Sequence, residues 1–312
     1  MSVVKNPRLK GILPVVPTPF HDDGTVDPDA FERVAQFCVK SGVGGVVFPG
    51  VASEYDYISS EEQHKLTTVL CRVAQDKVPV ICGGGKGTPE VIGANIRAAQ
   101  ALGAIAAMVL VPRQFSTDLA GALKFMQSVI AEAPGVDIIL QNAPAPVGAG
   151  LAPVDVIHIV NACPTIRYIK EEALPSGPRI SALQENAPAH LDGVIGGGGA
   201  RYLIDEMNRG AIAAMPAAEI VDVHVKMWNA FQSGDIDLVR SLYKRTLPLL
   251  VIQLIYRMRL TKHVLTMRGV LTNAHVRAPL PEFDSYDTAE LAVQVESMAD
   301  LLDNVSTSSI VA

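Results

Sequence analysis

A lysine followed two positions later by a glutamate is the residue pair in this sequence best suited to covalent chemistry with proton transfer. Lys170 ends the apolar run 166–170, and Glu172 comes shortly after it. Because strand side chains alternate between faces, Lys170 and Glu172 are expected on one face, with Tyr168 a layer below them as core. Burial disfavours the charged form of an amine, which then attacks carbonyl carbons. For an isolated motif the alternative is a surface strand that ends in a charged turn.

Eight short apolar segments, of which the lysine run is the sixth, are the expected strands. Each is followed by a stretch with the spacing of an amphipathic helix, such as 28–40, or the helix opened by the capping pair Ser59 and Glu62. Buried strands that alternate with helices indicate a parallel sheet covered on both faces. The eight units predict an α/β fold, a closed (β/α)8 TIM barrel. A doubly wound open sheet is the alternative, but no G-x-G-x-x-G motif follows the first strand. The expected strands are 11–17, 45–48, 78–82, 107–111, 138–142, 166–170, 190–195 and 211–215.

No strand is expected after residue 217, where the chain continues as helices. The apolar spacing predicts helices over 218–231, 236–256, 262–268 and 288–303. The first of these closes the barrel, and the others form a C-terminal helical appendage. We therefore expect a barrel over residues 1–232 and a C-terminal helical region over residues 233–312.

Composition narrows the possible partners and location. Of the 312 residues, 49% are apolar and only 19% are charged, which allows a large core and an interface between subunits. A net charge of -6 without any run of Lys or Arg argues against nucleic acid or an anionic membrane as partner. The cysteines form no C-x-x-C pair and the histidines have no ligand spacing, so no metal site is expected. Without an apolar leader or a stretch of membrane-spanning length, a cytoplasmic location is expected.

The ends of the predicted strands give a shortlist of site residues. In a barrel of this kind the active site lies at the carboxyl ends of the strands. Lys170 is the only strand-terminal lysine that the alternation aims inward. The shortlist comprises residues 49–54, 83–86, 112–115, 141–144, 170–172, 196–199 and 215–219.

Five short motifs are more specific together than singly. They are Gly11-Ile12 with Pro17-Thr18-Pro19-Phe20, Gly50-Val51-Ala52-Ser53-Glu54, Gln141-Asn142-Ala143-Pro144, Ile169-Lys170-Glu171 and Gly210-Ala211-Ile212. With them, nearly the whole chain resembles the dihydrodipicolinate synthase and N-acetylneuraminate lyase superfamily of Schiff-base barrel enzymes. The resemblance implies that Lys170 forms an imine with a small 2-keto acid, that no cofactor is needed beyond this covalent Schiff base, and that the protein is a homodimer or homotetramer.

The sequence departs from the family pattern at positions that bind substrate. Val51 and Ala52 replace the hydroxyl pair of the carboxylate-binding turn, so Ser53 and nearby backbone amides are expected to hold the carboxylate. Gln141 stands where the family has a proton-shuttling tyrosine, and it either contacts substrate or fills the tyrosine's space. Arg113 either clamps a substrate carboxylate or is an exposed loop arginine.

Glu54 and Gly197 complete the expected substrate-binding set. Glu54 either takes part in catalysis or holds the barrel mouth as a buried, hydrogen-bonded carboxylate. Gly197 belongs to the turn 196–199, which supplies only backbone where relatives often supply acids for sugar hydroxyls.

The altered pattern is similar to the branch that contains 2-keto-3-deoxy-L-arabonate dehydratase. That branch also lacks the tyrosine and uses, as acid and base, a glutamate two residues after the lysine, which is Glu172 here. The resemblance therefore implies a carbon-oxygen lyase of sugar acid catabolism that dehydrates 2-keto-3-deoxy-L-arabonate to 2-oxoglutarate semialdehyde. Two alternatives remain: a pyruvate-dependent aldolase or dihydrodipicolinate synthase-like enzyme, and a non-catalytic paralogue that binds 2-keto acids.

Overall fold

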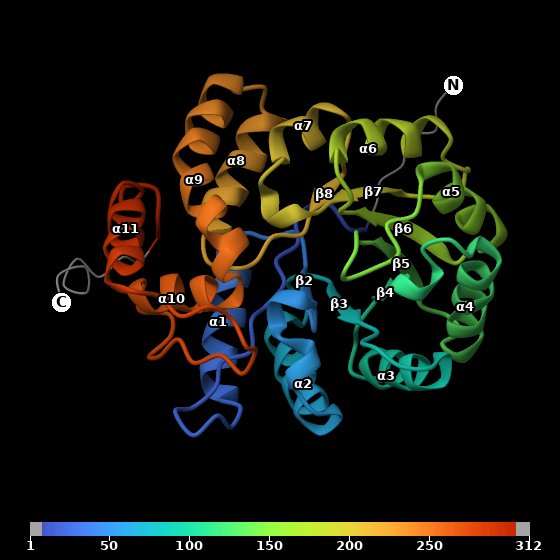
Figure 1. The fold of residues 1–312 in the computed structure, drawn as a ribbon, viewed down its shortest axis with the longest axis horizontal. Helices are drawn as coiled ribbons and strands as arrows, with labels where there is room; N and C mark the ends of the chain where they lie inside the picture. The colour runs from blue at the N-terminus through green and yellow to red at the C-terminus, as the bar shows by residue number, and fades with distance from the viewer. Residues whose placement is uncertain (1–7, 304–312) are drawn as a thin grey trace.

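Eight short parallel strands form one curved sheet with helices around it (Figure 1). The computed structural model describes residues 8–303. The strand order is β1-β8-β7-β6-β5-β4-β3-β2, so each strand from β2 to β7 pairs with the next strand along the chain, and β8 pairs with β1. The strands are β1 (Gly11–Ile12), β2 (Val46–Phe48), β3 (Val80–Gly83), β4 (Ala106–Leu110), β5 (Asp137–Asn142), β6 (Ile166–Glu171), β7 (Gly193–Gly196) and β8 (Ala213–Ala214).

The segment after β1 closes the sheet into a barrel. Val15 forms parallel bridges to Val47 on one side and to Ala217 on the other. The amide of Val47 donates to the carbonyl of Pro14 at 3.0 Å. Because Pro14 has no N–H to donate, the regular ladder of β1 stops at Ile12, well before the predicted end at residue 17. The predicted (β/α)8 barrel is therefore confirmed.

Helices follow the strands and cover the barrel. They are α1 (Pro28–Lys40), α2 (Ser60–Ala74), α3 (Pro89–Ala101), α4 (Leu119–Glu132), α5 (Pro153–Ala162), α6 (Ser176–Glu185), α7 (Leu203–Asn208) and α8 (Val221–Gln232). The predicted capping box opens α2: the Ser59 hydroxyl accepts from the Glu62 amide at 3.1 Å, and the Glu62 carboxylate accepts from the Ser59 amide at 2.8 Å. None of the helices within residues 8–303 has the length and apolar content of a membrane span.

Two apolar layers fix the direction of the strand side chains. The outer layer lies between the strands and the helices and contains Ile169. The inner layer fills the barrel, and Tyr168 packs there with 1% of its surface exposed, as predicted. Residues of β6 therefore alternate between the two layers. Other members of the inner layer are Leu13, Val47, Ile81, Met108, Ile139 and Ile195.

Three C-terminal helices follow the barrel: α9 (Ile236–Tyr256), α10 (Met258–Met267) and α11 (Ser285–Glu296). Helix α9 packs beside α8 (Figure 1). The buried Arg268, just after α10, forms a two-oxygen ion pair with Asp222 of α8, with N–O distances of 3.0 and 2.6 Å. Lys262 of α10 pairs with Glu54 after β2 at 2.5 Å. These contacts place α10 against the carboxyl ends of the strands.

Candidate functional site

A cavity of about 290 Å³ opens at the carboxyl ends of the strands. Its floor comes from β6 and the segments after β1 and β8, and its outer wall comes from α9 and α10. The placement agrees with the rule that barrel sites lie at this end. The charged and polar side chains in its wall are Lys170, Glu172, Arg201, Gln253, Arg257 and Thr261.

Lys170 and Glu172 contact each other in this cavity. Lys170 is 5% exposed, and its Nζ forms an ion pair with Oε1 of Glu172. Gln141, paired in register with Lys170 on β5, donates from Nε2 to the same oxygen at 3.2 Å. The alternation of strand side chains thus brings three of the predicted site residues together. An amine, a carboxylate and an amide within hydrogen-bonding reach form a site able to add to carbonyls and transfer protons.

Glu171 points to the opposite face of β6 and holds the strand ends. Its carboxylate is fully buried and accepts from Asn142 Nδ2 at 2.9 Å and from the Ala173 amide at 2.7 Å, and it pairs with Arg179 at 3.2 Å. Burial raises the pKa of Glu171 against the opposing effect of Asn142 and Arg179. This carboxylate ties β5, β6 and α6 together behind Lys170.

The glycine turn after β7 forms the backbone wall behind Glu172. A Cβ on Gly197 would overlap Cγ of Glu172, and a Cβ on Gly196 would overlap the carboxylate of Glu206. The φ of Gly197 is -126°, so the need for glycine here is close approach rather than a left-handed conformation. Gly197, predicted to bind substrate, packs against Glu172 and is not among the residues that line the cavity, whereas Gly198 and Gly199 line it.

Glu206, on α7 behind this turn, was not anticipated from the sequence. Its side chain is fully buried, and neither carboxylate oxygen has a hydrogen bond of acceptable geometry among the described residues. Burial raises the pKa of Glu206 to about 7, while the nearby Ser176 hydroxyl and Gly197 amide oppose the rise. The Glu172 charge also contributes to the rise, so Glu206 lies within electrostatic range of the site. The only feature of the sequence that could have pointed to Glu206 is its position shortly after the glycine turn.

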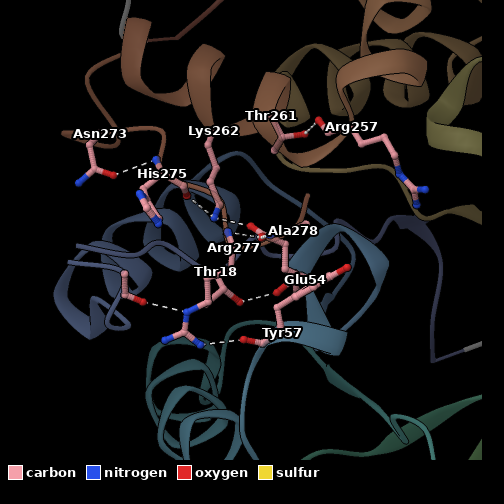
Figure 2. A network of polar contacts seen from close by, with 12 residues as sticks. Thr18, Glu54, Tyr57, Arg257, Thr261, Lys262, Asn273, His275, Arg277 and Ala278 are labelled. Carbon is pink, nitrogen blue, oxygen red and sulfur yellow. Dashed lines mark hydrogen bonds and ion pairs between the residues drawn. The ribbon is translucent and has the colours of Figure 1, made fainter. Parts of the chain in front are cut away.

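Ser53 and Glu54 lie beside the cavity and do not line it. The Ser53 hydroxyl donates to the carbonyl of Val16 at 2.5 Å and accepts from the Gly50 amide at 3.0 Å. The Glu54 carboxylate accepts from Lys262 Nζ and from the amides of Arg277 and Ala278 (Figure 2). These contacts favour the alternative in which Glu54 holds the barrel mouth. The cavity wall receives Val51 and Ala52 from this turn instead.

Arg113 is exposed on the 3-10 turn Arg113–Phe115 after β4 and is not part of the cavity wall. Two other arginines do line the cavity: Arg201 after β7 and Arg257 between α9 and α10. The shortlist of strand ends did not include them, because Arg257 comes from the C-terminal helices and Arg201 follows the glycine turn by two residues. Among residues 8–303, no group of three or more His, Cys, Asp or Glu side chains is arranged to hold a metal ion.

Solved structures share this fold over almost the whole chain. A dihydrodipicolinate synthase from Rhodopseudomonas palustris superposes with a TM-score of 0.86 at 24% identity, covering 95% of this chain and all of its own. A dihydrodipicolinic acid synthase family protein from E. coli K12, solved in complex with pyruvate, superposes with a TM-score of 0.82 at 22% identity. The match covers 94% of this chain and 99% of its own.

Sequence comparison gives the same family with two different named activities. A 4-hydroxy-tetrahydrodipicolinate synthase of Methanothrix thermoacetophila is 29% identical over 303 residues, covering 94% of this chain and 98% of its own. An L-2-keto-3-deoxyarabonate dehydratase of Azospirillum brasilense is 26% identical over 294 residues, covering 93% of this chain and 95% of its own. The model of the dihydrodipicolinate synthetase family matches residues 8–298, and the chain therefore belongs to this family.

Proposed function

We propose that this protein is a Schiff-base lyase that removes water from a small 2-keto-3-deoxy sugar acid. The observation that carries the proposal is the contact between the buried amine of Lys170 and the carboxylate of Glu172 in an open cavity. In this proposal Lys170 is the nucleophile and Glu172 is the acid and base. Family membership and the similarity to a named dehydratase support it.

The reaction begins when the Lys170 amine adds to C2 of the keto acid and water leaves, which gives an iminium ion. The iminium makes a C3 proton acidic, because the cation accepts the electrons that the C–H bond leaves behind. Glu172 takes this proton, and the resulting enamine expels the C4 hydroxyl, which the same carboxyl protonates so that it leaves as water. Water then hydrolyses the conjugated imine and frees Lys170. The net change is loss of one water, and the unsaturated product tautomerises.

Dehydration is favoured over retro-aldol cleavage by the residue at position 141. Cleavage between C3 and C4 needs a base that takes the proton of the C4 hydroxyl. Gln141 stands where the aldolase relatives carry a tyrosine, and a neutral amide does not accept that proton. Its Nε2 donates to Glu172 at 3.2 Å, so Gln141 orients the carboxylate in this proposal.

The first substrate to assay is 2-keto-3-deoxy-L-arabonate, whose dehydration yields 2-oxoglutarate semialdehyde. The similarity to the Azospirillum dehydratase supports this choice. The similarity to a 4-hydroxy-tetrahydrodipicolinate synthase makes condensation with pyruvate the second candidate. A non-catalytic paralogue is disfavoured because it would have no use for the Lys170 and Glu172 pair.

The proposal is tested by trapping and product analysis together. Pyruvate or 2-keto-3-deoxy-L-arabonate is incubated with the protein and borohydride, and the modified peptide is mapped by mass. We expect the adduct on Lys170, no adduct in Lys170→Arg, and an unchanged adduct in Lys86→Arg, since Lys86 is an exposed lysine paired with Asp56. Semialdehyde is the expected product. Pyruvate with glycolaldehyde would refute dehydration, and an adduct on Lys86 would refute the whole assignment.

A further inference from the structure

The cavity has a buried end and an open end, and each end carries a cationic side chain. Lys170 lies at the buried end, whereas Arg257 is exposed and belongs to the joint between α9 and α10. Figure 2 shows the side chain of Arg257 extending away from the network around Glu54 and Lys262. Within the described part of the chain, the guanidinium of Arg257 forms no contact that fastens α10 to the barrel, although Arg257 lies at the junction of α9 and α10.

The backbone at Arg257 is unusual for a residue with a side chain. Its φ of 48° and ψ of -119° lie in a region that favours glycine, and its amide donates to the carbonyl of Gln253 at 2.7 Å. Such a conformation carries a local conformational cost, and residues of this kind concentrate at ligand-binding positions. Glycine would fit the joint better. An arginine at this position thus calls for a function of its side chain.

Among the described residues, the two arginines at the open end form no hydrogen bond or ion pair with a carboxylate. Arg201 donates to Gln253 Oε1 at 2.7 Å and to the Leu250 carbonyl at 3.1 Å, which are both neutral acceptors. Gln253 is held in turn by the Glu219 carboxylate at 2.8 Å. Among the hydrogen bonds and ion pairs of residues 8–303, none involves the guanidinium of Arg257. Burial lowers the pKa of Arg201, and the charge of Arg257 adds to the effect, so the two cations lie close enough to repel each other.

We propose that Arg257, with Arg201 beside it, binds a second anionic group at the far end of the 2-keto acid, an inference that rests on the proposed function. The C1 carboxylate of the substrate is bonded to C2, which Lys170 holds, so that carboxylate stays at the buried end. The far end of the substrate reaches the open end of the cavity. A guanidinium binds a carboxylate or phosphate there by two parallel hydrogen bonds. The preferred substrates are thus 2-keto-3-deoxy acids that end in a carboxylate or a phosphate rather than in a neutral hydroxymethyl group.

Trapping with matched keto acids tests this without turnover. Borohydride adducts on Lys170 are titrated with 2-oxoglutarate against 2-oxopentanoate, and with 2-oxoadipate against 2-oxohexanoate, because each pair differs only in the terminal carboxylate. We expect at least one dicarboxylate to half-saturate at a concentration about tenfold lower than its partner, the scale of a charge-assisted hydrogen bond. In Arg257→Gln this difference should disappear. Equal half-saturation within both pairs in the native protein, or an unchanged preference in Arg257→Gln, would overturn the proposal.

Two further variants separate binding from folding. Arg257→Gly should lose the preference without lowering the thermal midpoint, since glycine suits the backbone of the joint. Arg240→Ala, which removes an exposed arginine elsewhere on α9, should keep the preference. Loss of preference in Arg240→Ala would mean that general positive charge is responsible, and the assignment to Arg257 would be wrong. If the native protein forms no adduct even with pyruvate, the Schiff-base function itself fails, which is a different result.

Turnover then identifies the terminal group. A 2-keto-3-deoxy acid with a terminal carboxylate, one with a terminal phosphate and 2-keto-3-deoxy-L-arabonate are compared at equal concentration. Faster turnover of either anionic compound, abolished in Arg257→Gln, supports the proposal and shows which group is bound. Slower turnover of both anionic compounds than of 2-keto-3-deoxy-L-arabonate overturns it.

Discussion

At the residue scale, a single carboxylate oxygen joins the proposed nucleophile and its neighbour. Oε1 of Glu172 contacts both the Lys170 amine and the Gln141 amide. In the proposed mechanism these contacts hold the carboxylate where a proton can pass between it and a substrate bound to Lys170. Gly197 closes the space behind it, so Glu172 cannot retreat in that direction.

Glu172→Gln tests the role of this carboxylate. The variant keeps the size of the side chain but cannot take the C3 proton. We expect the borohydride adduct on Lys170 to persist and turnover to fall by roughly 10²-fold or more, the usual scale for a missing acid or base. The adduct is measured by mass and turnover by release of the semialdehyde. A fully active variant would remove Glu172 from the mechanism.

Glu206 predicts a pH dependence of stability. Its pKa rises from 4.5 in the unfolded chain to about 7 in the native protein. Between these values the unfolded chain releases the proton while the native protein keeps it, so native stability falls as pH rises through this window. Above pH 7 the free energy of unfolding is lower by about 3 kcal/mol, because each pKa unit of difference between the two states corresponds to about 1.36 kcal/mol. Glu206→Gln should therefore be more stable than the native protein at pH 7.5 by up to about 3 kcal/mol.

The measurement is urea unfolding of both proteins from pH 4.5 to 8, taken as a difference. The difference isolates Glu206 from His224, whose burial lowers its pKa to about 4 and so raises stability with pH over part of the same window. The advantage of Glu206→Gln should vanish toward pH 4.5. Glu185→Gln, at an exposed position on α6, serves as control. A constant difference across the whole range would show that Glu206 does not titrate as stated.

At the element scale, the agreement between predicted and observed limits differs from one element to the next. The limits of α1 and α9 agree with the prediction, because Asp27 and Asp235 cap their first turns and Gly42 follows α1. Helix α10 begins at Met258 rather than at the predicted residue 262. The preceding break occurs at Arg257, whose left-handed backbone has no glycine or proline to signal it. β8 is shorter than predicted, since its ladder covers only Ala213–Ala214 of the expected range 211–215.

The candidate site was predictable where strand geometry alone decides direction. Alternation along β6 and register with β5 were enough to bring Lys170, Glu172 and Gln141 together. Irregular turns follow no such rule. The sequence therefore could not show that the Ser53 hydroxyl donates to the carbonyl of Val16 instead of facing the cavity. The wall from α9 and α10 depends on tertiary packing across the whole chain, which spacing in the sequence does not encode.

The contacts of Glu54 at the barrel mouth are expected to contribute to the stability of the protein. Its buried carboxylate accepts hydrogen bonds from Lys262, Arg277 and Ala278, so Glu54→Ala leaves a buried cation and two amides without their acceptor (Figure 2). We expect a loss of about 3–5 kcal/mol in the free energy of unfolding, measured with urea. Glu61→Ala, at an exposed position on α2, should have little effect.

A double-mutant cycle checks that the pairing is the cause. Lys262→Met should cost less in the Glu54→Ala background than in the native protein, because the cation is then already unpaired. Additive costs would mean that the two side chains act independently and that Glu54 contributes mainly through the amides.

At the scale of the whole molecule, apolar surface remains uncovered on α9. Val251, Leu254 and Ile255 are 53%, 60% and 57% exposed, and they lie within one turn and a third of that helix. Charged residues make up only 19% of the chain. Both features favour the expected homodimer or homotetramer, in which the α9 surface would be buried against another subunit.

Light scattering at micromolar concentration tests the assembly. For a chain of 33.2 kDa we expect the mass of two or four chains. If α9 forms the interface, Val251→Lys together with Ile255→Lys should reduce that mass, because burying two ammonium groups between apolar faces is strongly unfavourable. Val154→Lys, at a position 73% exposed on α5, should leave the mass unchanged.

A native monomer would contradict the expected assembly, and an unaltered oligomer in the double variant would place the interface elsewhere on the molecule. Because Leu254 also lines the cavity, an interface at α9 would border the open end of the site, and dissociation should then change keto acid binding as well as mass.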